Sequence, residues 1–335
     1  MRYLVTGATG FIGRNLCKIL VQSGHQVLAL VRNPEKARNL LPVNTVVSYG
    51  DITKQTTLQE PMQGVDGVFH LAAWYKIGSK DKEEAYLTNV EGTRNVLEVA
   101  KALNIAKVVY TSTVAVFSDT KGAKVNETYF HKGPWLSEYE RTKWIAHYKV
   151  ALPFAQTGLP LVIVQPGVVY GPGDTSAIGK SFTDYLRGQL PITPTKTAFC
   201  WGHVEDTARG HLLAMEKGKL YETYIIAGPI HSFREVFELA EKICGIKAPR
   251  LHPRPITLKT LSFFMKHLEG FFSLPAKYTA ESLRLMAGTT YIASNKKAKQ
   301  YLGFNPRALT QGLRETLEFE INKIKIPIKL PKKIQ

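Results

Sequence analysis

The stretch Thr6-Gly7-Ala8-Thr9-Gly10-Phe11-Ile12-Gly13 decides the fold that we predict for this chain. It follows the short apolar run Tyr3-Leu4-Val5 and leads into a helix-like stretch that ends near Ser23. A strand, a glycine turn and a helix in this order are typical of a dinucleotide-binding unit. Gly7 permits the tight turn, Gly10 lets the backbone approach a pyrophosphate, and Gly13 lets the helix pack close to the strand. The start of the helix then offers free N–H groups to the phosphates.

Outward from this turn, the first half of the chain alternates strand-like and helix-like segments. Strands are predicted at 26–31, 45–49, 67–71, 107–113 and 160–165, and long helices at 81–103 and 137–152. Short, nearly continuous apolar strands separated by helices indicate a parallel sheet that is covered on both faces. Right-handed crossovers then give a doubly wound, Rossmann-type α/β fold.

The second half of the chain shows a weaker alternation after Gly171-Pro172-Gly173. Helices are predicted at 178–187 and 203–217, one further strand at 221–226, and mostly helix from 230 to 322. We therefore predict a nucleotide-binding domain over 1–165, to which 203–229 returns, and a smaller, mostly helical substrate lobe. That lobe comprises 166–202 and 230–322, and a basic tail follows at 323–335.

Composition limits the function classes. The chain has 335 residues, 44% of them apolar, and a net charge of +17 from 44 basic and 27 acidic residues. Such a charge favours anionic partners, namely a phosphorylated cofactor, a membrane surface or nucleic acid, although a general preference for lysine explains it equally well. No helix-turn-helix, zinc-finger or RNA-recognition pattern is present, so we expect no nucleic-acid partner. The alternating basic and apolar tail could contact an anionic membrane weakly or remain solvated.

The three cysteines, Cys17, Cys200 and Cys244, are far apart and lack a C-x-x-C pair, which indicates neither a disulfide framework nor a metal site. The first predicted strand begins at about residue 2, which leaves no room for a signal peptide before it. No uncharged apolar run approaches the ~18 residues that a membrane span needs. We therefore expect a cytoplasmic protein.

The stretch Tyr139-Glu140-Arg141-Thr142-Lys143 carries the chemistry. A tyrosine and a lysine four residues apart on a helix share one face, about 6 Å apart along the axis. A free tyrosine has a pKa of about 10, and a nearby ammonium favours the phenolate and lowers that pKa. Such a pair is common by chance, but the hydroxyl-rich strand end Thr111-Ser112-Thr113 precedes it. A parallel sheet brings these groups and the glycine turn to one edge, where ligands bind.

In combination, these motifs resemble the extended short-chain dehydrogenase/reductases of the epimerase/dehydratase group. The stretch Val31-Arg32-Asn33-Pro34 and the hydroxyl triple further resemble the dihydroflavonol reductase-like branch. One departure is Gln165, where the group commonly has arginine. The likeness spans nearly the whole chain and rests on residues 6–13, 50–52, 70–73, 89–93, 110–113, 139–143, 165–167, 170–174, 203–206, 302–306 and 312–313.

The resemblance assigns catalytic roles by position. Tyr139 would be the acid/base, Lys143 its electrostatic partner, and Thr113 the hydroxyl that bonds the reacting oxygen. Ser112 is one place earlier and would point to the other side of the strand, so it is the weaker candidate. Asn89 occupies a position where a helix asparagine is frequent in the group.

The resemblance also implies a cofactor site and no metal. Asp51 and Ile52 would hold the adenine, and Pro166 and Val168 would approach the nicotinamide. The full predicted set is Gly7, Thr9, Gly10, Phe11, Ile12, Gly13, Arg32, Asp51, Ile52, Leu71, Ala72, Ala73, Thr111, Tyr139, Lys143, Pro166 and Val168.

The choice between NADP and NAD depends on the end of the second predicted strand. An acidic residue there binds the ribose 2′-hydroxyl of NAD, whereas an arginine accommodates the 2′-phosphate of NADP. This chain has Arg32 and no acid at that place, although Arg32 could also be an ordinary surface residue. The sequence therefore favours NADP over NAD.

Three functions compete at this point. The first is an NADPH-dependent reductase of an aldehyde or ketone, and the aromatic stretch Trp74-Tyr75-Lys76-Ile77-Gly78 favours a hydrophobic or aromatic carbonyl substrate. Trp135, Phe199 and Trp201 could join its pocket or belong to the core. The second is a nucleotide-sugar epimerase or dehydratase with tightly bound NAD. The third is a nucleotide-binding sensor without catalysis, which would not need the proton donor Tyr139.

Two predictions concern the surface of the molecule. Leu258, Leu261, Met265, Leu268 and Phe272 share one helical face, which indicates an amphipathic helix that covers the second lobe. Members of the resembled group often form homodimers through a four-helix interface, which here would use the two long helices at 81–103 and 137–152.

Overall fold

The structure is a computed structural model that describes residues 1–78, 81–269 and 279–325. Most of the tail predicted at 323–335, and Phe272, lie outside these residues. Among the helices that the structure describes, none is long and apolar enough to cross a bilayer.

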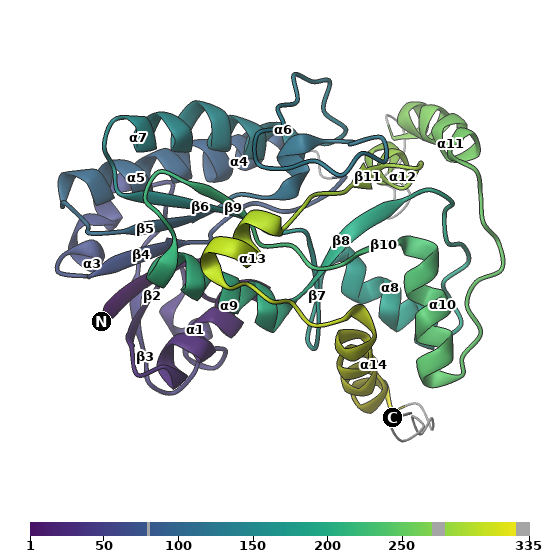
Figure 1. The fold of residues 1–335 in the computed structure, drawn as a ribbon, viewed down its shortest axis with the longest axis horizontal. Helices are drawn as coiled ribbons and strands as arrows, with labels where there is room; N and C mark the ends of the chain where they lie inside the picture. The colour runs from purple at the N-terminus through teal and green to yellow at the C-terminus, as the bar shows by residue number, and fades with distance from the viewer. Residues whose placement is uncertain (79–80, 270–278, 326–335) are drawn as a thin grey trace.

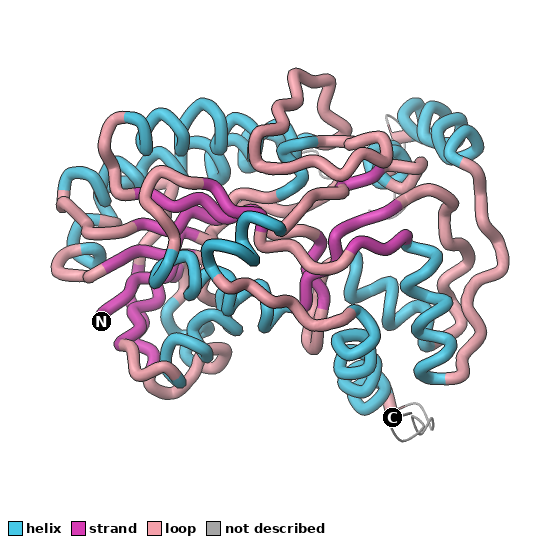
Figure 2. The backbone as a smooth tube through the Cα atoms, in the orientation of Figure 1, coloured by secondary structure: helices cyan, strands magenta, loops and turns pink. Residues whose placement is uncertain are grey.

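The centre of the fold is a parallel sheet of seven strands in the order β3-β2-β1-β4-β5-β6-β9 (Figures 1 and 2). Its register pairs Leu4 with Leu28 on one side and with Val68 on the other. The strands are β1 (Arg2–Thr6), β2 (Gln26–Val31), β3 (Thr45–Tyr49), β4 (Gly67–His70), β5 (Val108–Thr111), β6 (Leu161–Gln165) and β9 (Thr223–Ile225).

Helices cover both faces of this sheet, as the continuous apolar strands predict (Figure 1). On one face α1 (Phe11–Gln22) packs against α9 (Val204–Lys217), and the core between them includes Leu16 and Leu212. On the other face Val96 and Val150, from the two long helical stretches, belong to a second core cluster. The sheet is therefore buried between two apolar layers.

The two long helices predicted at 81–103 and 137–152 each contain a π-helical turn. The first runs through α4 (Lys82–Tyr86), η2 (Leu87–Glu91) and α5 (Gly92–Ala102). The second runs through α6 (Glu138–Ile145), η4 (Ala146–Ala151) and α7 (Leu152–Gln156). Such π turns shift the register of a helix by one residue and often occur at functional sites.

The second lobe contains a small sheet, which the prediction of a mostly helical lobe over 166–202 and 230–322 did not include. Strand β8 lies at its centre, antiparallel to β10 and parallel to β7 and β11. These strands have only two to six residues, too few for a clear alternation of apolar and polar positions. They are β7 (Val168–Tyr170), β8 (Ala198–His203), β10 (Ile230–Ser232) and β11 (Thr290–Tyr291).

Most of the remaining helices surround this small sheet, whereas α13 (Lys296–Leu302) packs against α9 and β9 of the large sheet. Phe182 and Phe237, from two of these helices, pack against each other and form a core with Trp201 on β8. Residues 203–229 leave this lobe, because β9 pairs with β6 at the edge of the large sheet. The helices are α8 (Ala177–Leu186), α10 (Phe233–Cys244), α11 (Pro255–Leu268), α12 (Ala280–Leu285), α13 (Lys296–Leu302) and α14 (Leu309–Ile324), and the short ones elsewhere are α2 (Pro34–Arg38), η1 (Gln55–Thr57), α3 (Gln59–Met62) and η3 (Val114–Phe117).

Candidate active site

The glycine turn between β1 and α1 has the geometry of a pyrophosphate cradle. Gly7 has a φ of +68°, and a Cβ there would lie 2.6 Å from the backbone nitrogen of Ala72. A Cβ on Gly13 would lie 2.1 Å from the carbonyl oxygen of Gly7. Helix α1 begins after Gly10, so no side chain at the N-cap accepts a hydrogen bond from the first N–H groups. The first turn of the helix also has no acidic residue. These N–H groups therefore fit a bound pyrophosphate.

A buried hydrogen-bond chain joins this turn to the end of β4. The backbone N–H groups of Leu71 and Ala72 donate to Thr6 Oγ1, which lies 2.8 Å from His70 Nδ1. The other ring nitrogen of His70 lies 3.1 Å from Thr93 Oγ1. Burial, with the charge of Lys143, lowers the pKa of His70 to about 3, so its imidazole is neutral. The neutral ring holds the cofactor-side ends of β1 and β4 together.

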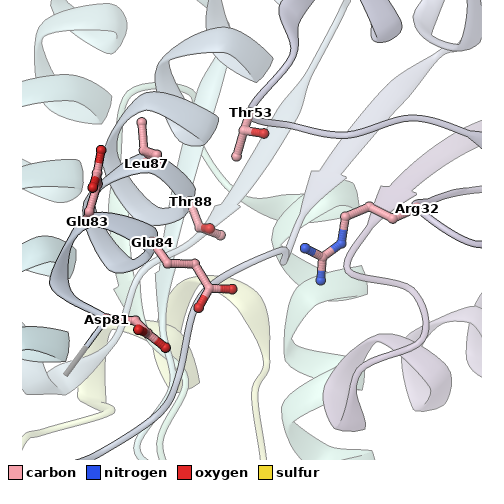
Figure 3. A pocket seen from close by; sticks show the side chains of 7 residues that line it. All are labelled: Arg32, Thr53, Asp81, Glu83, Glu84, Leu87 and Thr88. Carbon is pink, nitrogen blue, oxygen red and sulfur yellow. The ribbon is translucent and has the colours of Figure 1, made fainter. Parts of the chain in front are cut away.

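Arg32 projects into a pocket beside the end of β2 (Figure 3). This cavity of about 530 Å³ is also lined by Thr53 and, from the opposite side, by Glu84 on α4. The Asp51 carboxylate accepts hydrogen bonds from the N–H and hydroxyl of Thr53, at 3.0 and 2.8 Å, and so shapes the pocket wall. Ile52 is buried. The residues predicted for the adenosine end of a cofactor thus lie close together in space.

Tyr139 and Thr113 meet at the carboxyl ends of the central strands. Thr113 caps η3, where its hydroxyl accepts a hydrogen bond from Ala115 N at 3.1 Å. Burial raises the pKa of Tyr139, Tyr75 raises it further, and a hydrogen bond with Thr113 lowers it. The ring of Tyr75 stands edge-on to that of Tyr139, with centroids 4.8 Å apart. Tyr75 is half-exposed, so it forms a wall of the site next to the acid/base candidate.

Lys143 is a buried cation one helical turn after Tyr139. Its Nζ donates to the Tyr110 hydroxyl at 3.0 Å and to the Thr111 carbonyl at 2.8 Å. No carboxylate among the described residues forms an ion pair with it. Burial lowers its pKa to about 7. We expected this ammonium to lower the pKa of Tyr139, but the pKa is raised, mainly by burial of the phenol.

The neighbouring hydroxyls on β5 and beyond are held by two histidines. Ser112 Oγ lies 2.8 Å from Nδ1 of His147, and Thr111 Oγ1 lies 2.9 Å from Nε2 of His211. The Ser112 hydroxyl thus contacts η4, in the same helical stretch that carries Tyr139. Thr111 faces Lys143 with its carbonyl, while its hydroxyl contacts α9.

The remaining predicted cofactor residues line the same edge of the large sheet. Thr9, Phe11 and Ile12 are partly buried at the start of α1, and Ala73 is exposed after β4. Pro166 accepts a hydrogen bond from Val114 N at 3.0 Å, and Val168 begins β7.

Three further polar residues hold the site together, and two of them were not singled out from the sequence. Asn89, in the π turn η2, exchanges two hydrogen bonds with the backbone of Trp74 and donates to Thr142 on α6. Glu140 is fully buried and accepts from Ser118, from the Leu136 backbone and from the hydroxyl of Tyr291.

Glu281 on α12 is the third of these residues. Its carboxylate accepts from Gly78 N at 3.1 Å and from Glu138 N at 3.2 Å. It therefore joins the aromatic loop to the start of α6, the helix that contains Tyr139. Only the three-dimensional contacts of Glu140 and Glu281 reveal their roles, because no local motif marks either position.

The candidate aromatic pocket residues divide between core and site. Trp201 and Phe199 are 1% and 5% exposed and lie in a hydrophobic cluster of the second lobe. Trp135 is partly buried and packs edge-on against Trp144. Of the aromatic residues that we considered, Tyr75 thus contacts Tyr139, whereas Phe199 and Trp201 belong to the core.

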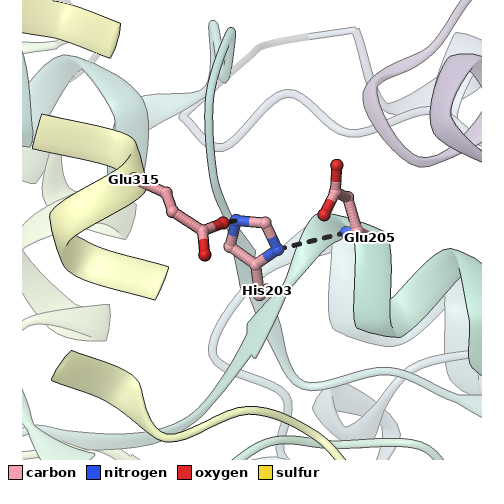
Figure 4. Close-up of side chains that lie close together, drawn as sticks. All are labelled: His203, Glu205 and Glu315. Atoms are coloured by element: carbon pink, nitrogen blue, oxygen red, sulfur yellow. Dashed lines mark hydrogen bonds and ion pairs between the residues drawn. The ribbon is translucent and has the colours of Figure 1, made fainter. Parts of the chain in front are cut away.

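His203, Glu205 and Glu315 form a cluster whose ligand atoms lie within 4.8 Å of one another (Figure 4). His203 caps α9, and its Nδ1 accepts the N–H of Glu205 at 3.4 Å. The proton of the neutral ring therefore sits on Nε2, the atom that a metal would need. Arg307 binds both carboxylates, at 3.0 and 2.5 Å. We interpret the cluster as a structural ion-pair network.

Comparison with known proteins agrees with this geometry. The NAD dependent epimerase/dehydratase family matches residues 3–227, well over half of the chain. The chain belongs to this family. It is thus an extended short-chain dehydrogenase/reductase, as its motifs predict, and the family is NAD(P)-dependent. Its relatives include reductases and epimerases.

Three similar proteins illustrate this range. A putative dihydroflavonol 4-reductase from Synechocystis sp. is 33% identical over 95% of this chain and 94% of its own length. The crystal structure of gox2253 covers 96% of this chain and 98% of its own, at 30% identity and a TM-score of 0.83. MoeE5 in complex with UDP-glucose and NAD covers 97% of this chain and all of its own, at 26% identity and a TM-score of 0.74.

Proposed function

We propose that this family member is an NADPH-dependent reductase of an aldehyde or ketone, with Tyr139 as the proton donor. The observation that carries this proposal is the meeting of Thr113, Tyr139 and Lys143 at the sheet edge that also holds the glycine turn. NADPH, when bound, supplies the hydride. The similarity to a named reductase over nearly the full chain supports the same reaction class.

The side chains have distinct tasks in this reaction. Thr113 and Tyr139 donate hydrogen bonds to the carbonyl oxygen, which gains negative charge as the carbon is reduced. Tyr139 then gives its proton to that oxygen, and its raised pKa keeps the phenol protonated in the free enzyme. Lys143 lies behind Tyr139 and offers the cofactor ribose a hydrogen-bond donor. The Tyr75 ring excludes water from one side of Tyr139.

NADPH is the proposed cofactor because Arg32 occupies the end of β2. Its guanidinium extends into the pocket beside Thr53, where a 2′-phosphate would find a charged, planar donor. The alternative is an epimerase or dehydratase with tightly held NAD, and the likeness to MoeE5 with UDP-glucose and NAD favours it. The half-exposed ring of Tyr75 favours a hydrophobic or aromatic carbonyl compound over a sugar nucleotide, whereas Trp74 is buried and donates to Glu84.

The test is a panel of aldehydes and ketones assayed with NADPH and with NADH. We expect NADPH-dependent turnover, which Tyr139→Phe lowers by about 100-fold or more because the general acid is lost. The dissociation constant of NADPH should change little in the same variant. Thr120→Val, at a buried hydroxyl on the far side of η3, is a control for disturbed packing.

Two results would contradict the proposal. Full activity of Tyr139→Phe would exclude this residue as the acid. Protein that is purified with stoichiometric NAD and consumes no NADPH with any carbonyl would favour the epimerase instead.

A further inference from the structure

Helix α11 lies at the edge of the molecule (Figure 1). Several of its large apolar side chains are exposed. Leu258 on this helix is 3% exposed and packs in a small cluster with Leu283 of α12. On the opposite side Ile256, Phe263 and Phe264 are 67%, 62% and 59% exposed. A helix that only covers a lobe turns its large apolar side chains inward. This helix has a second apolar face that the amphipathic pattern did not predict. On the predicted inward face Leu261 and Leu268 are themselves 44% and 43% exposed, so the prediction that this face covers the lobe holds only in part.

The charges of α11 and of the segment before it have one sign as far as its C-cap, Glu269, whose carboxylate accepts a hydrogen bond from Ala280 N. Between residues 247 and 268 the chain has five basic residues and no aspartate or glutamate. All five are exposed. They are Lys247, Arg250, Arg254, Lys259 and Lys266.

The lysines of α11 lie next to the aromatic side chains. At 100° per residue, Lys259 and Lys266 fall between the buried face and the side that carries Ile256 and Phe263. Aromatic side chains on one sector and lysines at its border are typical of a helix that lies in the plane of a membrane interface. The charge of +17 on the whole chain has the sign that an anionic surface attracts.

We propose that α11 binds the surface of an anionic lipid bilayer. Phe263, Phe264 and Ile256 enter the boundary between headgroups and acyl chains, and Lys259 and Lys266 contact the anionic headgroups. A second copy of the chain fits this face less well. A two-fold dimer would bring these lysines close to their symmetry mates, and residues 247–268 contain no carboxylate to neutralise them.

The membrane face is close to the candidate active site. Helix α11 packs against α12, and Glu281 of α12 binds both the loop at Gly78 and α6 at Glu138. A carbonyl substrate dissolved in the bilayer would therefore meet the lobe that borders the site. This consequence rests on the proposed reductase function, whereas the bilayer contact does not.

The test is co-sedimentation of the full chain with sucrose-loaded vesicles. One set contains phosphatidylcholine alone, and the other contains phosphatidylcholine mixed with phosphatidylglycerol. We expect binding to the mixed vesicles that weakens as salt is added. Phe263→Gln/Phe264→Gln should lower the partition coefficient by on the order of tenfold or more, because two apolar anchors are lost. Lys259→Gln/Lys266→Gln should lower it by about fivefold for each lysine.

Matched substitutions elsewhere separate this face from general charge and hydrophobicity. Lys296→Gln/Lys299→Gln removes two exposed lysines from α13, and Phe319→Gln removes a 42% exposed phenylalanine from α14. Neither variant should change vesicle binding by more than about twofold. A change within that limit is the effect of the lower general charge. Replacing Lys329, Lys332 and Lys333 by glutamine tests the basic tail in the full chain.

A variant that gains a fluorescence signal keeps the test valid if the double glutamine variants unfold. Phe264→Trp should show tryptophan quenching by brominated phosphatidylglycerol beyond that of the wild type, because its indole would lie among the lipids. Absence of this extra quenching, or wild-type protein that does not sediment with mixed vesicles, overturns the proposal. So does a dimer that Phe263→Gln/Phe264→Gln converts to a monomer, or vesicle binding that depends on the tail lysines alone.

Discussion

The buried ammonium of Lys143 is the residue with the largest electrostatic consequence. It is 2% exposed, and its neighbours His70 and His147 both have pKa values lowered to about 3, mainly by burial. Two neutral imidazoles therefore surround one cation, and no described carboxylate pairs with it. The site thus holds an uncompensated positive charge before a phosphorylated cofactor binds. A buried charge without a partner lowers stability.

This charge gives a pH-dependent prediction for the cofactor-free protein. Burial lowers the pKa of Lys143 to about 7, so the cost of the charged form is complete below pH 7 and falls as pH rises toward the unfolded value of about 10.5. Lys143→Met should therefore stabilise the protein most at pH 7 and below. Its advantage should shrink by about 1.4 kcal/mol for each pH unit above 7.

Denaturant unfolding of both proteins at pH 6, 7, 8 and 9 measures this difference. The control is Lys18→Met, which removes an exposed lysine from α1 and leaves the buried site intact. A difference between Lys143→Met and wild type that is flat from pH 7 to 9 would argue against a lowered pKa.

Arg32 is the residue that decides the cofactor in our proposal. Arg32→Asp removes the guanidinium and places a carboxylate where a ribose 2′-hydroxyl could bind it. We expect NADPH affinity to fall by about 10- to 100-fold, as for a lost charged hydrogen bond, while NADH affinity holds or rises. Fluorescence titration of both cofactors measures this. Arg38→Asp, on α2, is the matched control, and equal losses for both cofactors would point to general damage.

At the level of elements, the sequence was sufficient to predict strands and helices whose pattern of apolar residues extends over five or more neighbouring positions. The strands predicted at 26–31 and 45–49 have the bounds of β2 and β3, and the helix after the glycine turn ends one residue before Ser23. The two- and three-residue strands of the small sheet, such as β11, could not be predicted, because they form only by pairing with β8. The π turns likewise leave the apolar pattern of their helices almost unchanged.

The residues of the candidate site likewise divide into those that a local motif marks and those that it does not. Thr113, Tyr139 and Lys143 were predictable because a motif marks each of them, and the structure brings them together. Glu281 was not, because it lies 203 residues from its partner Gly78 in sequence. A contact of that length depends on how α12 docks, and nothing in the sequence around position 281 reports it.

The contacts of α12 with the aromatic loop lead to a prediction about substrate binding. Glu281→Ala removes two hydrogen bonds, to Gly78 N and Glu138 N, and so frees the aromatic loop. We expect KM for the carbonyl substrate to rise by about 3- to 30-fold, while the dissociation constant of NADPH stays unchanged. Steady-state kinetics and cofactor titration measure the two effects. Glu318→Ala, at an exposed site on α14, should alter neither, and a parallel loss of NADPH binding in Glu281→Ala would contradict the assignment.

At the level of the whole molecule, Arg307 connects the C-terminal helix to the large sheet. Its guanidinium forms a two-pronged pair with Asp206, from Nε to Oδ2 and from Nη2 to Oδ1, both at 3.0 Å, and it also binds Glu205 and Glu315. The partners come from α9, which packs on α1, and from α14 of the second lobe. One cation therefore neutralises carboxylates of both lobes.

Loss of this connection should be costly. Arg307→Met leaves three carboxylates together without a cation, and we expect the free energy of unfolding to fall by about 3 kcal/mol. The free energy of unfolding of Arg307→Lys should lie between those of Arg307→Met and the wild type. Lysine keeps the positive charge but cannot form the two parallel hydrogen bonds of a guanidinium. Denaturant unfolding at pH 7 measures the changes. Arg209→Met, exposed on α9, should stay within about 0.5 kcal/mol of wild type, and an equal loss there would mean that charge alone matters.

The proposed homodimer also belongs to this scale and stays a prediction. The two long helical stretches that would form it lie on one face of the large sheet, where Leu87 is 44% exposed. Light scattering of the full chain would decide it.

The path of residues 203–229 has a practical meaning for chimeric proteins. After β8 the chain crosses back to form α9 and the edge strand β9 before it re-enters the small lobe at β10. A transplant of the small lobe from a relative therefore requires two donor inserts, one on each side of this returning piece. A chimera with a single junction would import a foreign α9 against the host α1, and so mismatch the layer that supports the glycine turn.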